Sequence, residues 1–135
     1  RPDRMAPLGS AGIRATFSTD HKSYTARRGR TISVPVLVKN TSQESFPHGD
    51  LIFGLSYHLL SQDGQMIAHD NDRTYCEQPL PPGGEATMDL KVTAPSAAGI
   101  YQIEIDLVWE GVMWFKDNGN PTCTVTLEVR PLLGR

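Results

Sequence analysis

Residues 99–115, Gly-Ile-Tyr-Gln-Ile-Glu-Ile-Asp-Leu-Val-Trp-Glu-Gly-Val-Met-Trp-Phe, decide the fold class of this chain. Apolar side chains occupy every second position from Tyr101 to Trp109. Most of the positions between them are polar, and so is Glu110, which follows Trp109. Because successive side chains of a strand point to opposite faces, the stretch predicts a long strand with an apolar face and an acidic face. Both tryptophans, Trp109 and Trp114, lie close to these carboxylates in the sequence. This combination suggests a surface that holds a polar, ring-shaped ligand.

The same alternation recurs in short segments along the rest of the chain, and turn residues separate the segments. Ser61-Gln62-Asp63-Gly64 is the clearest turn, because Asp-Gly accepts the positive φ that a tight hairpin needs. Pro35 indicates that its strand lies at a sheet edge or carries a bulge, since proline cannot donate to a ladder. The predicted strands cover residues 13–19, 31–39, 51–60, 65–69, 73–77, 86–93 and 122–130, besides the long strand whose alternation runs over residues 101–110.

A chain of 135 residues with 10 prolines, 12 glycines and no helical period fits one all-β domain. We expect an immunoglobulin-like, two-sheet antiparallel β-sandwich of about seven to nine strands. Tyr101, at the start of the long strand, is typical of a tyrosine corner. The sandwich is expected at residues 12–131, with a flexible linker or tail at 1–11 and a C-terminal tail at 132–135.

Charge and hydropathy narrow the class of partner. The net charge is −2 and most basic residues are scattered, so no basic stripe can follow a phosphate backbone, and nucleic acid is not expected. No apolar run approaches the ~20 residues of a membrane span, and no signal-peptide core is present, so membrane insertion is not expected. The sequence begins with Arg1, and we expect a fragment of a longer protein.

Cysteine and histidine spacing predicts neither a disulfide framework nor a metal site. Cys76 and Cys123 are too few for such a framework, and Cys123 continues an apolar alternation that is typical of a buried, free thiol. A bridge between the two cysteines remains an alternative. The segment His69-Asp70-Asn71-Asp72 lacks the ligand spacing of a calcium loop, and the histidines follow no zinc pattern. No cofactor is therefore expected.

Short motifs follow one another in a characteristic order: Val38-Lys39-Asn40-Thr41-Ser42, Leu55-Ser56-Tyr57-His58, Asp63-Gly64, Arg73-Thr74, Leu80-Pro81-Pro82-Gly83, Ala94-Pro95, Gly99-Ile100-Tyr101, Asp106-Leu107-Val108-Trp109-Glu110-Gly111 and Trp114-Phe115. The set resembles an accessory domain appended to bacterial glycosyltransferases and sugar-modifying enzymes of cell-surface polysaccharide synthesis. More distantly, it is similar to the C-terminal sugar-binding domain of the ATP-driven exporters of O-antigen polysaccharide. The resemblance covers about residues 13–130.

The resemblance implies an immunoglobulin-like sandwich without catalysis, which recognises glycan or docks enzymes of that pathway. It also implies a cytoplasmic location, peripheral to the inner membrane through the parent protein.

The outward faces of the two richest strands are expected to form one polar platform, if the strands are neighbours in a sheet. Carboxylates there would accept hydrogen bonds from vicinal sugar hydroxyls. Trp114 and Phe115, in the turn after the long strand, would stack on a sugar ring. The predicted ligand-binding residues are Ser56, His58, Arg73, Asp106, Glu110, Trp114 and Phe115.

Structural roles are alternatives for the aromatic residues and for Arg73. Trp109 is expected in the core, and Trp114 and Phe115 fit the core as well as a ligand site. For Arg73 an ion pair across strands, with Asp106 or Glu110, is favoured over ligand contact.

Catalysis is not expected. Glu104 and Asp106 lie about 6.7 Å apart along one strand, but they point the same way and do not flank a scissile bond. No nucleophile elbow, phosphate loop or dinucleotide fingerprint occurs in the sequence.

Three functions follow from the sequence. The first is a noncatalytic carbohydrate-binding module for O-antigen-like polysaccharide, part of a larger glycosyltransferase or polysaccharide export protein. The second is an interaction or dimerisation scaffold of the same pathway, in which the apolar residues Ile52, Leu60 and Val108 contact a partner domain or a second copy. The third is a secreted adhesion domain, which a bridge between the cysteines would favour.

Overall fold

The computed structural model describes residues 14–46 and 52–131. Strands and turns dominate these residues, and the expected all-β fold is confirmed. The predicted tails, and residues 13 and 51 at the starts of two predicted strands, lie outside the described residues. The elements in chain order are β1 (Ala15–Thr19), β2 (Ser23–Arg27), β3 (Thr31–Asn40), β4 (Phe53–Ser61), β5 (Met66–Ala68), β6 (Thr74–Tyr75), β7 (Glu85–Thr93), β8 (Gly99–Trp109), β9 (Met113–Trp114), the 3-10 turn η2 (Phe115–Asn118) and β10 (Cys123–Arg130).

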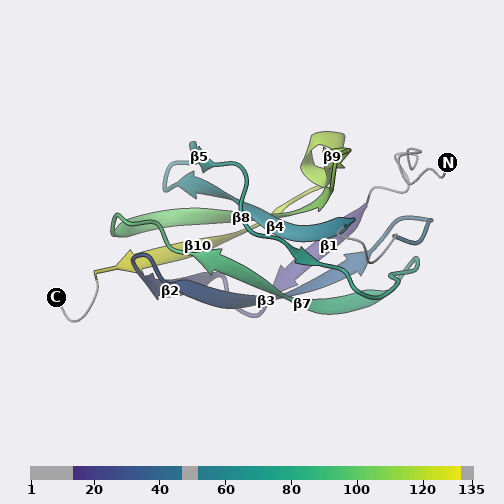
Figure 1. Cartoon of the computed structure of the whole chain (residues 1–135), viewed down its shortest axis with the longest axis horizontal. Helices are drawn as coiled ribbons and strands as arrows, with labels where there is room; N and C mark the ends of the chain where they lie inside the picture. The colour runs from purple at the N-terminus through teal and green to yellow at the C-terminus, as the bar shows by residue number, and fades with distance from the viewer. Residues whose placement is uncertain (1–13, 47–51, 132–135) are drawn as a thin grey trace.

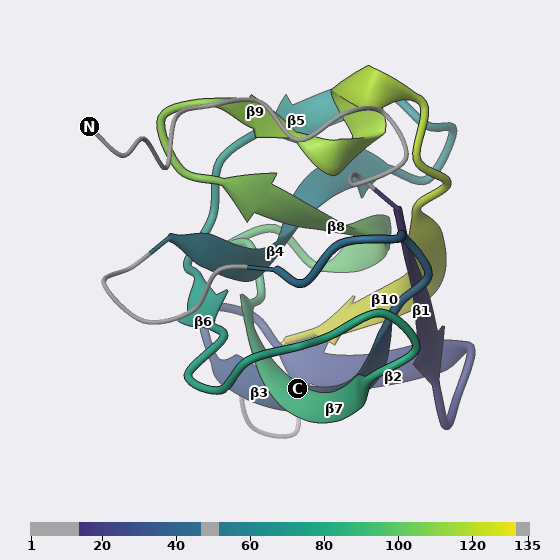
Figure 2. The same cartoon turned by 90° about the vertical axis from the view of Figure 1, so that its right-hand side faces the viewer.

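Two sheets face each other. β3 lies between β1 and β7 in a three-stranded sheet, and a seven-stranded sheet follows the order β2-β10-β8-β4-β5, with β6 added to β4 and β9 added to β8. Figures 1 and 2 show β3 and β7 on one side of β4 and β8. β2 pairs in parallel with β10, and the other strand pairs among the described residues are antiparallel. The predicted two-sheet sandwich is therefore confirmed, with one parallel pairing added.

The core fills the space between the sheets, as the alternation predicts. An aromatic cluster closes one part of it, where the Phe53 ring lies 5.1 Å from Phe46, 5.4 Å from Trp109 and 5.6 Å from Phe115, between centroids. Trp109 is only 1% exposed, which confirms its expected place in the core. Aliphatic residues of the four longest core strands complete the packing: Val34, Val36, Val38, Leu55, Leu59, Leu90, Val92, Ile103, Ile105 and Leu107.

Two strands of the structure, β2 and β9, were not predicted from the sequence. β2 was not predicted, because its five residues are mostly polar and only Tyr24 and Ala26 alternate inward. β3 lies between β1 and β7, but β1 pairs with residues 36–40 of β3, so Pro35 lies in the part of β3 that has an open edge, as predicted. The nitrogen of Pro35 points toward β1, since the even-numbered residues of β3 bond β7, and β1 has already ended at Thr19, opposite Val36. Pro35 therefore removes no ladder bond.

Local predictions at two turns are confirmed. Tyr101 Oη donates to the carbonyl of Ala97 at 2.6 Å, as in a tyrosine corner. The hairpin from β4 to β5 turns at Gly64, whose φ is 92°.

Cys76 and Cys123 are free thiols. The alternative of a bridge between them is therefore wrong, and the hypothesis of a secreted adhesion domain loses its support. Burial raises the pKa of the Cys76 thiol to about 11, which makes it an inert apolar group.

Candidate functional site

The two strands predicted to form the polar platform are neighbours. β4 and β8 pair so that Ser56 lies opposite Asp106 and His58 lies opposite Glu104. The expectation that this face is open is wrong, however, because Ser56, His58 and Asp106 are all 0% exposed. Figure 2 shows why: β9 and η2 lie on the side of β8 that faces away from β3 and β7. The acidic face of β8 is therefore an interior, with a further layer of chain above it.

Two segments, residues 69–73 and 113–118, cover this face, and we call them the covering segments. Trp114 from the second of them is 9% exposed. Its ring centroid lies 4.5 Å from that of His58 and 5.2 Å from that of His69, and the Arg73 guanidinium lies 5.0 Å from it. Trp114 therefore packs the two covering segments against β4 instead of presenting a free ring to solvent.

His58 and Asp106 form a buried pair beneath Trp114. His58 Nε2 lies 2.9 Å from Asp106 Oδ2, and His58 Nδ1 lies 2.8 Å from the carbonyl oxygen of His69. Both ring nitrogens thus face acceptors, and the imidazolium form satisfies both. Burial lowers the pKa of His58, but the hydrogen bonds to Asp106 and to His69 outweigh burial, so the pKa is raised above 6.5.

The remaining polar atoms of this face bind backbone of the covering segments. Asp106 Oδ1 accepts from the backbone nitrogens of Leu107, at 2.8 Å, and Lys116, at 3.2 Å. Ser56 Oγ lies 3.1 Å from the carbonyl oxygen of Asn71 and 2.8 Å from that of Asp72. Both oxygens of Asp106 are therefore occupied by internal partners.

Arg73 makes one of the ion pairs that the sequence favoured, with Glu110. Arg73 Nε donates to Glu110 Oε2 at 2.7 Å, and Tyr75 Oη donates to the same oxygen at 2.8 Å. Arg73 also donates to Asp70 Oδ1 at 3.0 Å. Burial raises the pKa of Glu110, but Arg73 and Tyr75 outweigh this, so the pKa is lowered below 4.5. The side chains of Arg73 and Glu110 are 18% and 26% exposed, so this pair forms the rim of the covered face.

The predicted binding residues thus divide into three groups. Ser56, His58 and Asp106 lie beneath the covering segments, and Trp114 lies on top of them. Arg73 and Glu110 form the rim. Phe115 points the other way, into the aromatic cluster of the core, and is fully buried.

The apolar patch expected on this face is likewise absent as a surface. Ile52 and Val108 are buried, and Leu60 is partly exposed. Val108, which broke the alternation of the long strand, is buried because it pairs with Trp114 of β9. Of the three residues predicted to contact a partner, only Leu60 therefore lies at the surface.

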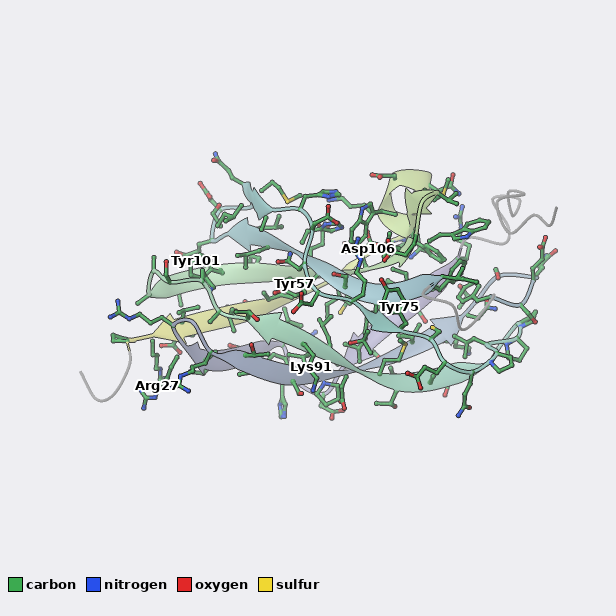
Figure 3. The ribbon with its side chains drawn as sticks, in the orientation of Figure 1. Arg27, Tyr57, Tyr75, Lys91, Tyr101 and Asp106 are labelled. Atoms are coloured by element: carbon green, nitrogen blue, oxygen red, sulfur yellow. The ribbon has the colours of Figure 1, made fainter. Side chains whose placement is uncertain are left out.

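A groove of about 500 Å³ lies elsewhere, between residues 74–80 and β7, and residues 85–89 form its other wall. Buried Cys76, Leu80 and Met88 contribute apolar surface to it. Its lining contains carboxylates but no lysine or arginine. Figure 3 shows Tyr75 beside β7 at this edge of the sandwich. The sequence predicted both flanking segments, yet nothing in it indicates that they come together.

Metal and membrane sites are not seen in the described part of the chain. Within residues 14–46 and 52–131, no cluster of histidine, cysteine and acidic side chains is placed to hold a metal ion. In the same residues, no helix has the length and apolar character to cross a bilayer.

No protein-family model matches the chain, and no curated protein matches it. Among solved structures, it is similar to the CARDB domain of a Pyrococcus furiosus protein, with a TM-score of 0.49 and 14% identity over 87% of this chain and 93% of that one. It is also similar to Spo0M, a sporulation control protein from Bacillus subtilis, with a TM-score of 0.47 and 14% identity over 87% of this chain and 49% of that one. A family 123 glycoside hydrolase from Clostridium perfringens gives a TM-score of 0.43 and 10% identity, over 82% of this chain and 22% of that one. These values are too low for a functional conclusion.

Proposed function

We propose that this chain is a noncatalytic interaction module that docks another polypeptide, within a larger protein of bacterial surface-polysaccharide synthesis or export. The observation that carries the proposal is the contrast between the covered face of β4 and β8, whose polar groups bind one another, and the exposed edge of β7 beside the groove. The pathway rests on the resemblance of the sequence motifs described above. The cytoplasmic location, peripheral to the inner membrane, rests on the same resemblance.

The covered face argues against recognition of a ligand by Asp106. A sugar that reached its carboxylate would have to displace Trp114 and break the bonds from His58 and Lys116. Leaving a buried charge without its partner typically costs about 3–5 kcal/mol. A catalytic acid or base must come within hydrogen-bond reach of its substrate, and the same burial keeps Asp106 and His58 from doing so.

The edge of β7 favours a polypeptide as the ligand. β7 is the last strand of the three-stranded sheet, and its outward side chains Glu85, Thr87, Asp89 and Lys91 are exposed. An unpaired strand edge binds extended chains through backbone hydrogen bonds, and adjacent pockets select side chains. The groove beside residues 85–89 is such a pocket.

Glycan recognition is a second candidate function, and the groove is the observation that favours it. Its volume of about 500 Å³ is within the usual range of small-ligand sites. Tyr75 offers an aromatic ring, and Glu77 and Gln78 offer hydrogen-bonding groups of the kind that bind sugar hydroxyls. This site differs from the predicted one, since it shares no residue with the covered face.

Two binding screens with the same labelled chain separate these functions. One uses an array of extended peptides, and the other an array of bacterial surface oligosaccharides. Peptide binding that is lost in Thr87→Pro but kept in Thr87→Ala supports the interaction module, because only the first substitution removes the outward N–H. Glycan binding alone, abolished by Tyr75→Ala and unaffected by Thr87→Pro, would replace the first function by the second.

A further inference from the structure

Four arginines gather at the end of the sandwich where β2 and β10 end, and we call them the arginine cluster. Arg27 and Arg130 are the last residues of these two strands, and they lie opposite each other in the parallel pair. Arg28 and Arg30 flank Gly29 in the turn from β2 to β3. The Arg28 N–H donates to the carbonyl oxygen of Arg130 at 2.8 Å, which holds the turn against the end of β10. The parallel pairing therefore brings a cation that is remote in sequence beside three that are close together.

The cluster is exposed, and few carboxylates pair with it. All four arginines are exposed, and Figure 3 shows Arg27 at this end of the molecule. Arg130 Nε lies 3.2 Å from Glu128 Oε2, and Arg27 Nη1 donates to a backbone carbonyl oxygen at 2.9 Å. Among the residues that the structure describes, no carboxylate pairs with Arg27, Arg28 or Arg30. Three of the four charges are therefore not neutralised by the sandwich itself.

The rest of the chain has the opposite charge. The whole sequence carries a net charge of −2, and the four arginines together with Glu128 contribute +3, so all other residues together carry −5. Such asymmetry is typical of proteins that contact nucleic acid or a membrane. The field of the molecule would turn the arginine cluster toward an anionic surface, because the remaining surface is on balance repelled by it.

The surroundings of the cluster favour a membrane surface over nucleic acid. A phosphate backbone is followed by a stripe of basic residues, whereas these four lie together where two strands end. Ile100 of β8 lies opposite Glu128 on the same face of the sheet as Arg130, and it is 36% exposed. An exposed apolar side chain beside basic residues adds affinity at the boundary between lipid headgroups and hydrocarbon.

We infer that the arginine cluster binds an anionic membrane surface, with its guanidinium groups on lipid phosphates and Ile100 at the headgroup boundary. Arginine suits this contact because its planar guanidinium donates two parallel hydrogen bonds to a phosphate. The inference goes beyond the proposed function, since it depends neither on the groove nor on the docking of a polypeptide. It gives the module a membrane contact of its own, in addition to the location that the parent protein would provide.

Flotation of the full chain with lipid vesicles tests the inference, and circular dichroism confirms that each variant is folded. One set of vesicles is phosphatidylcholine alone, and the other contains equal parts of phosphatidylcholine and phosphatidylglycerol. The wild type should bind the anionic vesicles about a hundredfold more tightly, because each basic residue near such a surface contributes about fivefold and Glu128 offsets one of the four. Salt at about 1 M should abolish this preference, since the screening length then falls to about 3 Å.

Two double variants show whether the cluster itself makes the contact. Arg28→Ala/Arg30→Ala should weaken binding to the anionic vesicles about 25-fold. Lys22→Ala/Lys39→Ala removes the same charge from exposed positions outside the cluster, and it should change binding by less than about twofold. Ile100→Ser should weaken binding about threefold or more, because it removes apolar surface from the contact.

A wild type without preference for anionic vesicles at low salt would overturn the inference, as would equal losses in the two double variants. Duplex DNA that binds as tightly as the anionic vesicles would overturn it in favour of nucleic acid. Unchanged binding in Ile100→Ser would refute the role given to Ile100. The peptide array keeps the proposed function separate, because Arg28→Ala/Arg30→Ala leaves the groove intact and should bind peptides like the wild type. Vesicle binding without peptide binding would refute only the proposed function, and the reverse would refute only this inference.

Discussion

The covered face of β4 and β8 differs from the edge of β7 beside the groove in how its polar groups are used. On the covered face, His58, Asp106 and Ser56 are all bonded to neighbouring chain and fully buried. On the β7 edge, Thr87 and Lys91 are exposed and their backbone groups have no partner among the described residues. Polar residues on a strand therefore do not by themselves mark a binding surface, because their function depends on what the chain places above them.

The largest effect should come from removing the buried carboxylate. Asp106→Ala leaves the His58 imidazolium and the Lys116 N–H without an acceptor, so the free energy of unfolding should fall by about 3–5 kcal/mol. Urea unfolding followed by circular dichroism measures this. Glu128→Ala, which breaks the exposed pair with Arg130, is the matched control and should change stability by less than about 1 kcal/mol. Equal losses of stability in the two variants would contradict the prediction that the buried pair contributes more than the exposed pair.

Removing the indole above this pair should have the next largest effect. Trp114→Ala deletes the ring that packs on His58, His69 and Arg73, and large-to-small changes of buried aromatics cost about 3–5 kcal/mol in cores. Because Trp114 lies at the surface of its layer, we expect a loss near the lower end, about 3 kcal/mol. Thermal and urea unfolding measure the loss, and amide exchange should show that residues 69–73 become less protected. A variant of native stability would mean that Trp114 is free to meet a ligand.

The two regions should also differ in their response to pH. The folded pKa of His58 is raised, so its contribution to stability is fully present below the unfolded value of about 6.5 and is lost as pH rises through the folded pKa. The pKa values of Glu104 and Glu110 are lowered, so their contributions are present above about 4.5 and are lost as pH falls through the folded values.

This prediction is checked by the free energy of unfolding of the wild type and of His58→Gln, measured from below pH 4.5 to above pH 6.5. Stability of the wild type should decline on the alkaline side of the His58 transition, and His58→Gln should not show that decline. His21→Gln, at an exposed histidine outside the covered face, is the control and should keep the wild-type profile. An unchanged profile in His58→Gln would mean that the imidazole is not charged in the folded state.

A smaller effect is expected at the rim. Glu110→Gln weakens the bonds from Arg73 and Tyr75, and because this pair is partly exposed the cost should be about 1 kcal/mol. Tyr75→Phe, which removes only one hydroxyl donor to the same oxygen, should cost no more than this. Urea unfolding curves of both variants measure the two losses of stability. A loss as large as that of Asp106→Ala would contradict the prediction, because it would mean that the rim pair contributes as much as the buried pair of the covered face.

How far the sequence predicts this molecule depends on the range of the interaction involved. Period-two alternation indicated most of the strands. The Asp-Gly pair indicated the turn at Gly64, and the place of Tyr101 at a strand start indicated the tyrosine corner, because each of these features depends on neighbours in sequence. The pairing of Arg73 with Glu110 was predictable from charge and strand position. These features need no knowledge of what covers the sheet.

The rest depends on contacts between distant segments. Alternation gives the face on which Asp106 lies, but only tertiary packing decides that residues 69–73 and 113–118 cover that face. Val108 was the signal that could have revealed it, since an apolar residue on an acidic face indicates that the face is buried. The free edge of β7 and its groove depend on strand order, which alternation within one segment does not encode.

Amide hydrogen exchange measured residue by residue by NMR, at low protein concentration, tests the contrast between these two regions most directly. The amides of Leu107 and Lys116, which donate to Asp106, should exchange slowly, and both should exchange faster in Asp106→Ala. The amides of Thr87 and Lys91 should exchange rapidly in the wild type. Rapid exchange at Lys116 together with slow exchange at Thr87 would contradict the account, because it would mean that the acidic face is open and the β7 edge is already paired within the chain.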